Sequence, residues 1–85
     1  MKIQIRFFAS VREKLGCSAI SFESDAETLS TAEVREQLIQ RGEPWSEALG
    51  KQKVLRLALN QNMINDEAQL SDGDELAFFP PVTGG

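Results

Sequence analysis

The sequence predicts an α+β roll, in which a mixed β-sheet has one main helix packed across one of its faces. Two observations predict this class. Segments in which apolar and polar residues alternate lie on both sides of a single long helix-like segment. The first and last of these strand-like segments have strongly apolar faces, which is typical of central strands. Because a mixed sheet contains at least one parallel pair, we expect these two strands to pair in parallel.

The first 23 residues predict two strands that form a hairpin. Residues 2–8 alternate, with Ile3, Ile5 and Phe7 on one face and polar side chains on the other. Residues 19–23 alternate again. This second segment is therefore expected to return beside the first strand.

A short helix is expected between these two strands. Ser10 and Glu13 have the S-x-x-E spacing of a capping box, in which the serine side chain accepts a hydrogen bond from a main-chain amide three residues later. Gly16 ends this helix after Leu15, because glycine readily takes the left-handed conformation of a helix end. Cys17, which comes next, is interpreted as a small packing residue.

The main helix is predicted over Thr31–Arg41. Ser30 and Glu33 supply a second capping box, and Gly42 occupies the position of a left-handed C-cap. Pro44 then predicts a helical restart with proline at its first position, where the missing amide hydrogen costs nothing. The helix therefore has a start signal and a stop signal on its two sides.

The last third of the chain predicts three further strands. Val54–Asn60 alternates between leucines on one face and other side chains on the opposite face, and Met63–Ile64 forms a short strand after a turn. Asp72 and Gly73 give a turn signal. Glu75–Phe79 is then predicted as the last strand, with Phe78 and Phe79 on opposite faces.

Composition excludes several classes of function. Thirteen acidic and nine basic residues give a net charge of −4, which argues against binding to nucleic acid phosphates. The absence of histidine excludes imidazole catalysis, and a single cysteine, Cys17, cannot form an internal disulfide or a cysteine-only metal site. No apolar segment approaches the roughly 20 residues of a membrane span, and the first residues do not resemble a leader. We expect a cytoplasmic protein with no metal site, no membrane partner and no internal active site.

The chain ends in an unusual segment. Phe79 is followed by two prolines, then by Val82, Thr83 and two glycines. Proline fixes φ and restricts the preceding residue, whereas glycine lacks the Cβ that would clash in a narrow site. We therefore predict a folded domain over residues 1–79 and an extended tail over residues 80–85, which carries a carboxylate at its tip.

Residues 70–85 resemble the end of the small, sulfur-carrying subunit of molybdopterin synthase, a family with the β-grasp (ubiquitin-like) fold. Residues 5–13 are similar to the first strand and helix of the same family. The length and the order of the elements also fit, so the resemblance extends over the whole chain. Gly-Gly alone is unspecific, but the aromatic strand and paired prolines before it are specific.

The resemblance implies a carrier cycle at Gly85, with Gly84 beside it. An E1-like activating enzyme uses ATP to adenylate the carboxylate of Gly85, and sulfur transfer then leaves a thiocarboxylate. The tail inserts into the large catalytic subunit, within a heterotetramer, and donates sulfur to a cyclic pyranopterin precursor to form the molybdopterin dithiolene. The small subunit itself is then not catalytic and binds no cofactor.

The residues before the glycines are expected to contact the large subunit. Phe79, with Pro80 and Pro81, is interpreted as an apolar anchor, because the alternation of the last strand turns Phe79 away from Phe78. Val82 and Thr83 complete the predicted contact segment. The alternative for Phe79 is a second core face beneath the helix. Nearby charges are expected to solvate a helix end and a turn, and charged contacts with the partner are the alternative; these residues are Arg12, Asp72, Asp74 and Glu75.

The same C-terminal residues are compatible with three other functions. A different β-grasp sulfur carrier, such as one that serves thiazole synthesis, shares the Gly-Gly end. A ubiquitin-like modifier would join Gly85 to lysines of other proteins. A pure interaction module would have an inert tail. The aromatic residues and prolines at 78–81 favour the molybdopterin carrier over the thiazole carrier.

Overall fold

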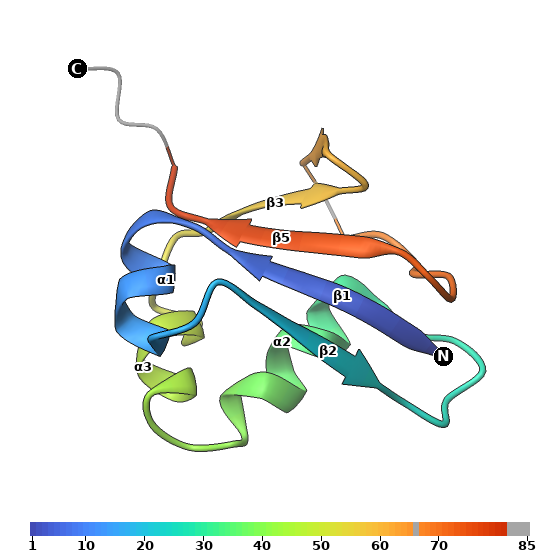
Figure 1. Ribbon diagram of the computed structural model, residues 1–85, viewed down its shortest axis with the longest axis horizontal. Helices are drawn as coiled ribbons and strands as arrows, with labels where there is room; N and C mark the ends of the chain where they lie inside the picture. Colours follow the sequence, from blue (N-terminus) through green and yellow to red (C-terminus); the bar gives the residue numbers. More distant parts are fainter. Residues whose placement is uncertain (66, 82–85) are drawn as a thin grey trace.

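The computed structural model describes residues 1–65 and 67–81, which form one five-stranded mixed sheet with three helices on one of its faces (Figure 1). The elements are β1 (Lys2–Phe7), α1 (Ala9–Leu15), β2 (Ala19–Glu23), α2 (Thr31–Ile39), α3 (Trp45–Leu49), β3 (Arg56–Leu59), β4 (Asn62–Ile64) and β5 (Glu75–Phe79). This arrangement confirms the predicted α+β class with a mixed sheet.

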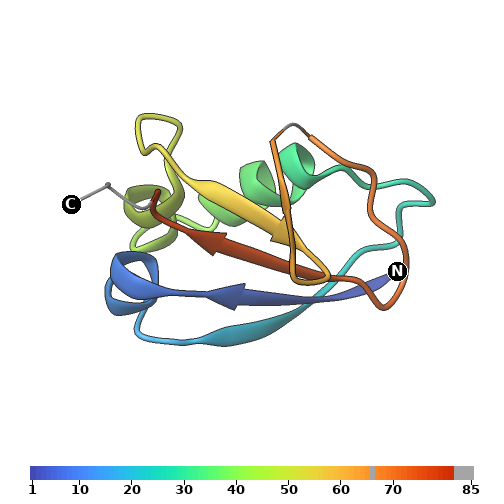
Figure 2. The ribbon, with the colours of Figure 1, turned by 90° about the horizontal axis from the view of Figure 1, so that it is seen from above.

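The strand order in the sheet is β2-β1-β5-β3-β4. β1 and β5 pair in parallel at the centre, as the sequence predicted, and the other neighbours pair antiparallel. Figure 2 shows β1 and β5 side by side and pointing the same way. The two ends of the domain sequence are therefore joined directly by hydrogen bonds across the middle of the sheet.

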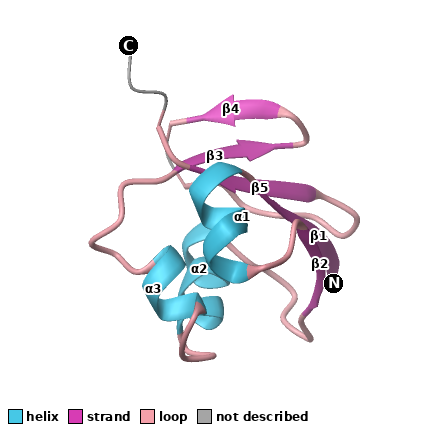
Figure 3. Ribbon diagram, turned by 60° about the vertical axis from the view of Figure 1, so that its left-hand side comes forward, coloured by secondary structure: helices cyan, strands magenta, loops and turns pink. Residues whose placement is uncertain are grey.

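The core lies between the sheet and the helices. Ile3, Ile5 and Phe7 of β1 are buried, as the alternation of this strand requires, and Phe78 of β5 stacks on Phe7 with ring centroids 6.2 Å apart. The buried side chains Val34 and Leu38 of α2 belong to the same cluster. All three helices lie on this face, and Figure 3 shows no helix on the opposite face of the sheet over the described residues. We call that opposite face the outer face.

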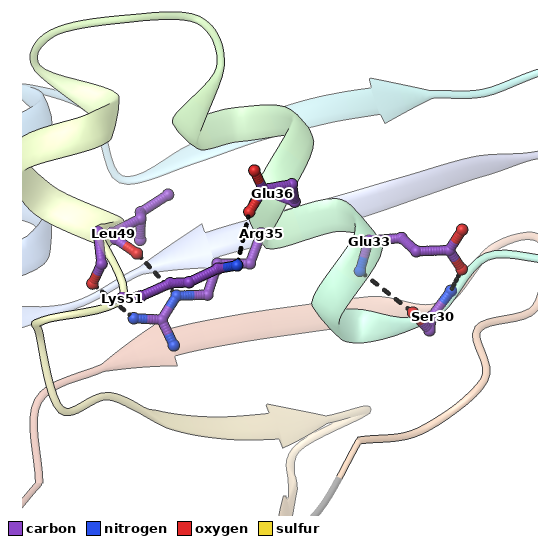
Figure 4. A network of polar contacts seen from close by, with 7 residues as sticks. Ser30, Glu33, Arg35, Glu36, Leu49 and Lys51 are labelled. Atoms are coloured by element: carbon purple, nitrogen blue, oxygen red, sulfur yellow. Dashed lines mark hydrogen bonds and ion pairs between the residues drawn. The ribbon is translucent and has the colours of Figure 1, made fainter.

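Helix α2 begins at the predicted capping box. The hydroxyl of Ser30 accepts a hydrogen bond from the amide of Glu33 at 3.1 Å, and the carboxylate of Glu33 accepts one from the amide of Ser30 at 2.9 Å (Figure 4). The helix ends at Ile39, two residues before the predicted end, with Gln40 as its C-cap. Gly42 has the predicted left-handed conformation, with φ of 86°, but lies beyond the cap.

Arg35 of α2 holds the end of α3 and the loop after it. Its guanidinium donates to the main-chain oxygens of Leu49 at 2.7 Å, Gly50 at 2.8 Å and Lys53 at 3.0 Å, and Figure 4 shows it directed at this loop. Partial burial lowers the pKa of the Arg35 guanidinium below its ordinary value. On the surface, Lys51 pairs with Glu36 at 3.5 Å.

The predicted capping box at Ser10 and Glu13 is wrong. With Ser10 as its N-cap the helix would start at Val11, but α1 starts two residues earlier, at Ala9, and its N-cap is Phe8, which makes no side-chain capping bond. β1 ends at Phe7, and Ala9 then has a positive φ of 53°, so the chain turns directly from the sheet into the helix. Ser10 therefore lies inside the first turn, where its hydroxyl cannot cap the helix.

Other predicted boundaries shift as well. β1 ends at Phe7 and not at residue 8. Strand β3 covers Arg56–Leu59 instead of Val54–Asn60, because Asn60 turns with φ of 50° and Val54 is 73% exposed. β4 starts at Asn62, one residue before the prediction, and α3 starts at Trp45 with Pro44 as N-cap. These elements are still the ones that the sequence predicted.

Within the described ranges, no helix has the length and apolar character needed to cross a membrane. Cys17 is half-buried and packs against the core cluster, in agreement with its interpretation as a packing residue. An ion pair of 2.7 Å between Lys14 and Glu47 links α1 to α3. This hydrogen bond lowers the pKa of the exposed Glu47 carboxyl.

Candidate partner-binding site on the outer face

The predicted contact residues start at the end of β5. Phe79 is the last residue of that strand, and Pro80 and Pro81 follow it; all three are half-buried. Val82, Thr83, Gly84 and Gly85 were also predicted as site residues and lie outside the described residues. The structure therefore describes Phe79, Pro80 and Pro81, whereas their role as an anchor, the remainder of the tail and the domain boundary after residue 79 stay predictions.

Phe79 lies on the outer face and not under the helices. In the β3–β5 register Phe79 is opposite Arg56, while its neighbour Phe78 is opposite Leu57 and is fully buried in the core. The alternative in which Phe79 forms a second core face beneath the helix does not agree with this register. The side chain is therefore on the face that the helices leave uncovered.

An apolar groove of about 610 Å³ runs along the outer face beside β5, and we call it the outer groove. Its floor contains Ala58 of β3 and Ala77 of β5, which are directly opposite in the register. Two alanines between larger side chains leave a hollow, because a methyl group fills little of the space above a sheet. The other lining residues are Phe8, Ala9, Gln61, Glu75, Phe79, Pro80 and Pro81.

One wall of the outer groove is a pair of aromatic rings. Phe8 and Phe79 meet edge to face, with ring centroids 6.5 Å apart and an interplanar angle of 87°. The guanidinium of Arg6 lies 6.0 Å from the Phe8 ring and also approaches Glu75 at 3.8 Å. Phe8 nevertheless keeps 44% of its surface exposed. A large aromatic side chain in this position is typical of the anchors of protein interfaces.

Two of the predicted charged residues, Asp72 and Asp74, make specific hydrogen bonds. The carboxylate of Asp72 accepts a hydrogen bond from the amide of Lys2 at 2.6 Å, and that of Asp74 accepts one from the amide of Ser71 at 2.7 Å. Asp74 also accepts a hydrogen bond from the side chain of Asn60 at 3.0 Å. These residues therefore do more than the predicted solvation of a turn: Asp72 and Asp74 hold main-chain and side-chain groups around it, and Glu75 lies in β5 beside Arg6 and lines the outer groove.

The sequence did not identify Phe8 or Gln61 as site residues. The sequence does contain a pattern that indicates Phe8. It lies on the same face of the first strand as Lys2, Gln4 and Arg6, which is the face expected to be exposed to solvent, so an aromatic residue there suggests a contact with another molecule. Gln61 had no signal of its own, since its place at the groove depends on how β3 and β5 pair. The groove therefore adds residues distant in sequence to the predicted Phe79, Pro80 and Pro81.

The described residues contain no group of three or more histidine, cysteine or acidic side chains arranged to hold a metal ion. The lining of the outer groove is mostly apolar, so the groove suits recognition through apolar contact, next to Pro80 and Pro81.

A family model described as the ThiS family matches residues 5–85, which is nearly the whole chain. The chain belongs to the ThiS family. The molybdopterin synthase sulfur carrier subunit of Haemophilus influenzae is 49% identical, over 98% of this chain and 99% of that protein. The subunit of the same name from Escherichia coli is 41% identical, with the same coverage of both chains. The recognised family and the resemblance to these sulfur carrier subunits are thus confirmed.

Two solved structures show the same fold. A complex of subunits 1 and 2 of the molybdopterin-converting factor from Helicobacter pylori matches with a TM-score of 0.69 and 31% identity, and the match covers both chains completely. SAMP1 from Haloferax volcanii matches with a TM-score of 0.76 and complete coverage of both chains, but with 21% identity. The second likeness shows the ubiquitin-like β-grasp fold alone.

Proposed function

We propose that this chain is the sulfur carrier subunit of a molybdopterin synthase. The observation that carries the proposal is the identity of 49% and 41% to two proteins named as that subunit, each over nearly the full length of both chains. The β-grasp core and the apolar outer groove beside the tail support it. In this role the chain binds no cofactor, has no catalytic activity alone, and works in the cytoplasm, where ATP is available to its activating partner.

The proposed reactive group is the carboxylate of Gly85. At neutral pH a terminal carboxylate is ionised, since its pKa is about 3.3–3.7, and it is then a poor electrophile. In the activating enzyme one carboxylate oxygen attacks the α-phosphorus of ATP and releases pyrophosphate. A persulfide sulfur of the donor next attacks the acyl carbon and releases AMP, which leaves an acyl disulfide. A thiol then attacks the donor-side sulfur of that disulfide, so that a new disulfide forms on the donor and the thiocarboxylate leaves as the soft nucleophile for the pyranopterin precursor.

The large subunit is proposed to cover the outer groove. Pro80 and Pro81 form part of the groove wall. Residues 82–85 can span at most roughly 13–14 Å, at ~3.3–3.6 Å per residue. A protein that encloses the carboxylate of Gly85 therefore also lies close to the groove, and Phe79 with its two prolines provides an apolar anchor for it. Val82 and Thr83 are proposed to line the entry of the tail into the large subunit.

Reconstitution tests this function. The purified chain is combined with the large subunit, an activating enzyme, ATP, a sulfur donor and the cyclic precursor, and the dithiolene product is measured. We expect product with the full chain and none with a chain that lacks Gly84 and Gly85, whose melting temperature should be unchanged because the described elements end at Phe79.

Alanine substitution of either glycine provides a finer test. Gly84→Ala and Gly85→Ala should leave the melting temperature unchanged and reduce the yield of thiocarboxylate, because a Cβ widens the tip of the tail. Full yield with either alanine would refute the steric argument. Ladders of covalent conjugates, in place of product, would instead support the modifier alternative.

A further inference from the structure

A second groove, of about 420 Å³, lies on the helix side of the point where the tail begins, and we call it the helix-side groove. It is formed by α1, by α3 and by the loop that runs from α3 to β3 (Figure 3). Pro80 lines this groove and also the outer groove. The start of the tail therefore separates two grooves of different character.

Val54, in the loop before β3, is an apolar side chain that the fold leaves exposed inside the helix-side groove. It keeps 73% of its surface exposed. The main chain just before it is fixed, because the amide of Lys53 donates to the oxygen of Gly50 at 2.8 Å and the oxygen of Lys53 accepts from Arg35 at 3.0 Å. The loop therefore presents Val54 from a defined position.

The helix-side groove also contains two lysines and two glutamates. Lys14 and Glu47 neutralise each other in their ion pair of 2.7 Å. Over residues 1–65 and 67–81, neither Lys53 nor Glu13 forms an ion pair. The pKa of the Glu47 carboxyl is lowered mainly by its hydrogen bond to Lys14, and the charge of Lys53 lowers it further. The ammonium of Lys53 thus acts within the groove and is available to an anion.

The chain itself supplies a segment with the matching chemistry. Residues 82–85 follow directly on the prolines and carry an apolar side chain, Val82, at one end and the terminal carboxylate at the other. They can span at most roughly 13–14 Å, at ~3.3–3.6 Å per residue. Val54 and Lys53 offer an apolar contact and a positive charge in the same order, next to Pro80.

We propose that residues 82–85 of the free chain lie in the helix-side groove, with Val82 on Val54 and the Gly85 carboxylate paired with the ammonium of Lys53. Because the tail is joined to the domain, its effective concentration at the groove is on the order of millimolar, so weak contacts are enough. Any protein that takes up the Gly85 carboxylate must first withdraw it. The contact is therefore autoinhibitory, and it does not rest on the proposed function.

Charge favours the helix-side groove over the outer groove as the position of the tail. The charged residue that lines the outer groove is Glu75, which repels a carboxylate. The nearby Arg6 already approaches Glu75 at 3.8 Å. In the helix-side groove Glu13 also repels the carboxylate, so the Gly85 end lies toward Lys53 and away from α1.

NMR of the isotopically labelled, full-length chain, with no partner present, tests this position. We expect a nuclear Overhauser effect between the methyl groups of Val82 and Val54. Its absence would overturn the proposal, and so would an effect from Val82 to Ala58 or Ala77, which would place the tail in the outer groove. A signal that weakens on dilution would show the tail of a second copy and would also overturn it.

Lys53→Gln tests the ion pair, with Lys51→Gln as the matched control. Removing the Lys53 charge should lower the ratio of docked to free tail roughly twofold to fivefold, as expected for an exposed pair. An uncharged gadolinium chelate in solution should then relax the Gly85 amide proton more strongly. Lys51→Gln removes the same charge from the same loop, but this lysine pairs with Glu36 on α2, so the relaxation should stay unchanged.

Two further variants test the apolar contact and the repulsion. Val54→Ser should also expose the Gly85 amide proton and leave the melting temperature unchanged, because Val54 makes little contact with the fold. Glu13→Gln should protect that proton further. An equal change in Lys53→Gln and Lys51→Gln would show that net charge alone holds the tail, and an unaltered signal in Val54→Ser would exclude the apolar contact; either result refutes the proposal. Neither result bears on the proposed function, because no partner is present.

Discussion

Replacement of Phe8 by alanine gives a quantitative test of the outer groove. A phenylalanine side chain buries about 150–250 Å² when fully covered. Because Phe8 is 44% exposed, about 90 Å² remains for a partner to cover. At ~25 cal/mol per Å², this area corresponds to about 2 kcal/mol of binding free energy. Phe8→Ala should therefore weaken binding to the large subunit roughly 30-fold to 40-fold.

The assay is titration calorimetry with the purified large subunit, after circular dichroism has shown that the variant is folded. Phe8→Ala also loses the contact with Phe79, so a lower melting temperature is expected. Val34→Ala is the matched control, because it removes buried apolar groups from α2 on the other side of the sheet and should lower the stability without changing the affinity. Equal affinities of Phe8→Ala and the original chain would refute the docking of the large subunit on this face.

Three further predictions concern the framework of the domain. Ser30→Ala removes the capping bond at the start of α2 and should lower the free energy of unfolding by about 1 kcal/mol in urea titrations, and an unchanged midpoint would show that the cap contributes nothing. Arg35→Met removes three hydrogen bonds to main-chain oxygens and should cost about 2 kcal/mol in the same titration; a loss no larger than that of Lys51→Met, at a mostly exposed lysine, would contradict it. Lys14→Met should return the lowered pKa of Glu47 toward 4.5 in an NMR titration, and an unaltered titration would exclude Lys14 as the cause. Because the folded pKa is lowered, the ion pair contributes fully to stability at pH values above 4.5, and this contribution is lost as the pH falls through the folded pKa.

The sequence predicted the elements well where one local pattern decides the structure. Alternation placed β1 and β5, and the serine–glutamate spacing at Ser30 placed the start of α2. The same spacing failed at Ser10, because there the turn at Ala9 sets the start of α1. A capping pattern is therefore reliable only where the preceding chain lets the serine adopt the extended backbone conformation of an N-cap residue.

The outer groove was less predictable for a physical reason. Its floor exists because Ala58 and Ala77, 19 positions apart, become direct neighbours in the β3–β5 register. No local pattern encodes that pairing. Phe79 was identified from its parity within β5, whereas Gln61 enters the site only through the pairing of the strands. Residues that enter a site only through strand register are therefore the hardest to predict from a single sequence.

The reactive group that we propose for this protein is the carboxylate of Gly85. Intact-mass measurement after incubation with an activating enzyme, ATP and a sulfur donor tests it most directly. We expect the mass to increase by the exchange of one oxygen for one sulfur atom, and fragmentation to locate the change at Gly85. An unchanged mass, or a sulfur adduct at Cys17 instead, would contradict the claim.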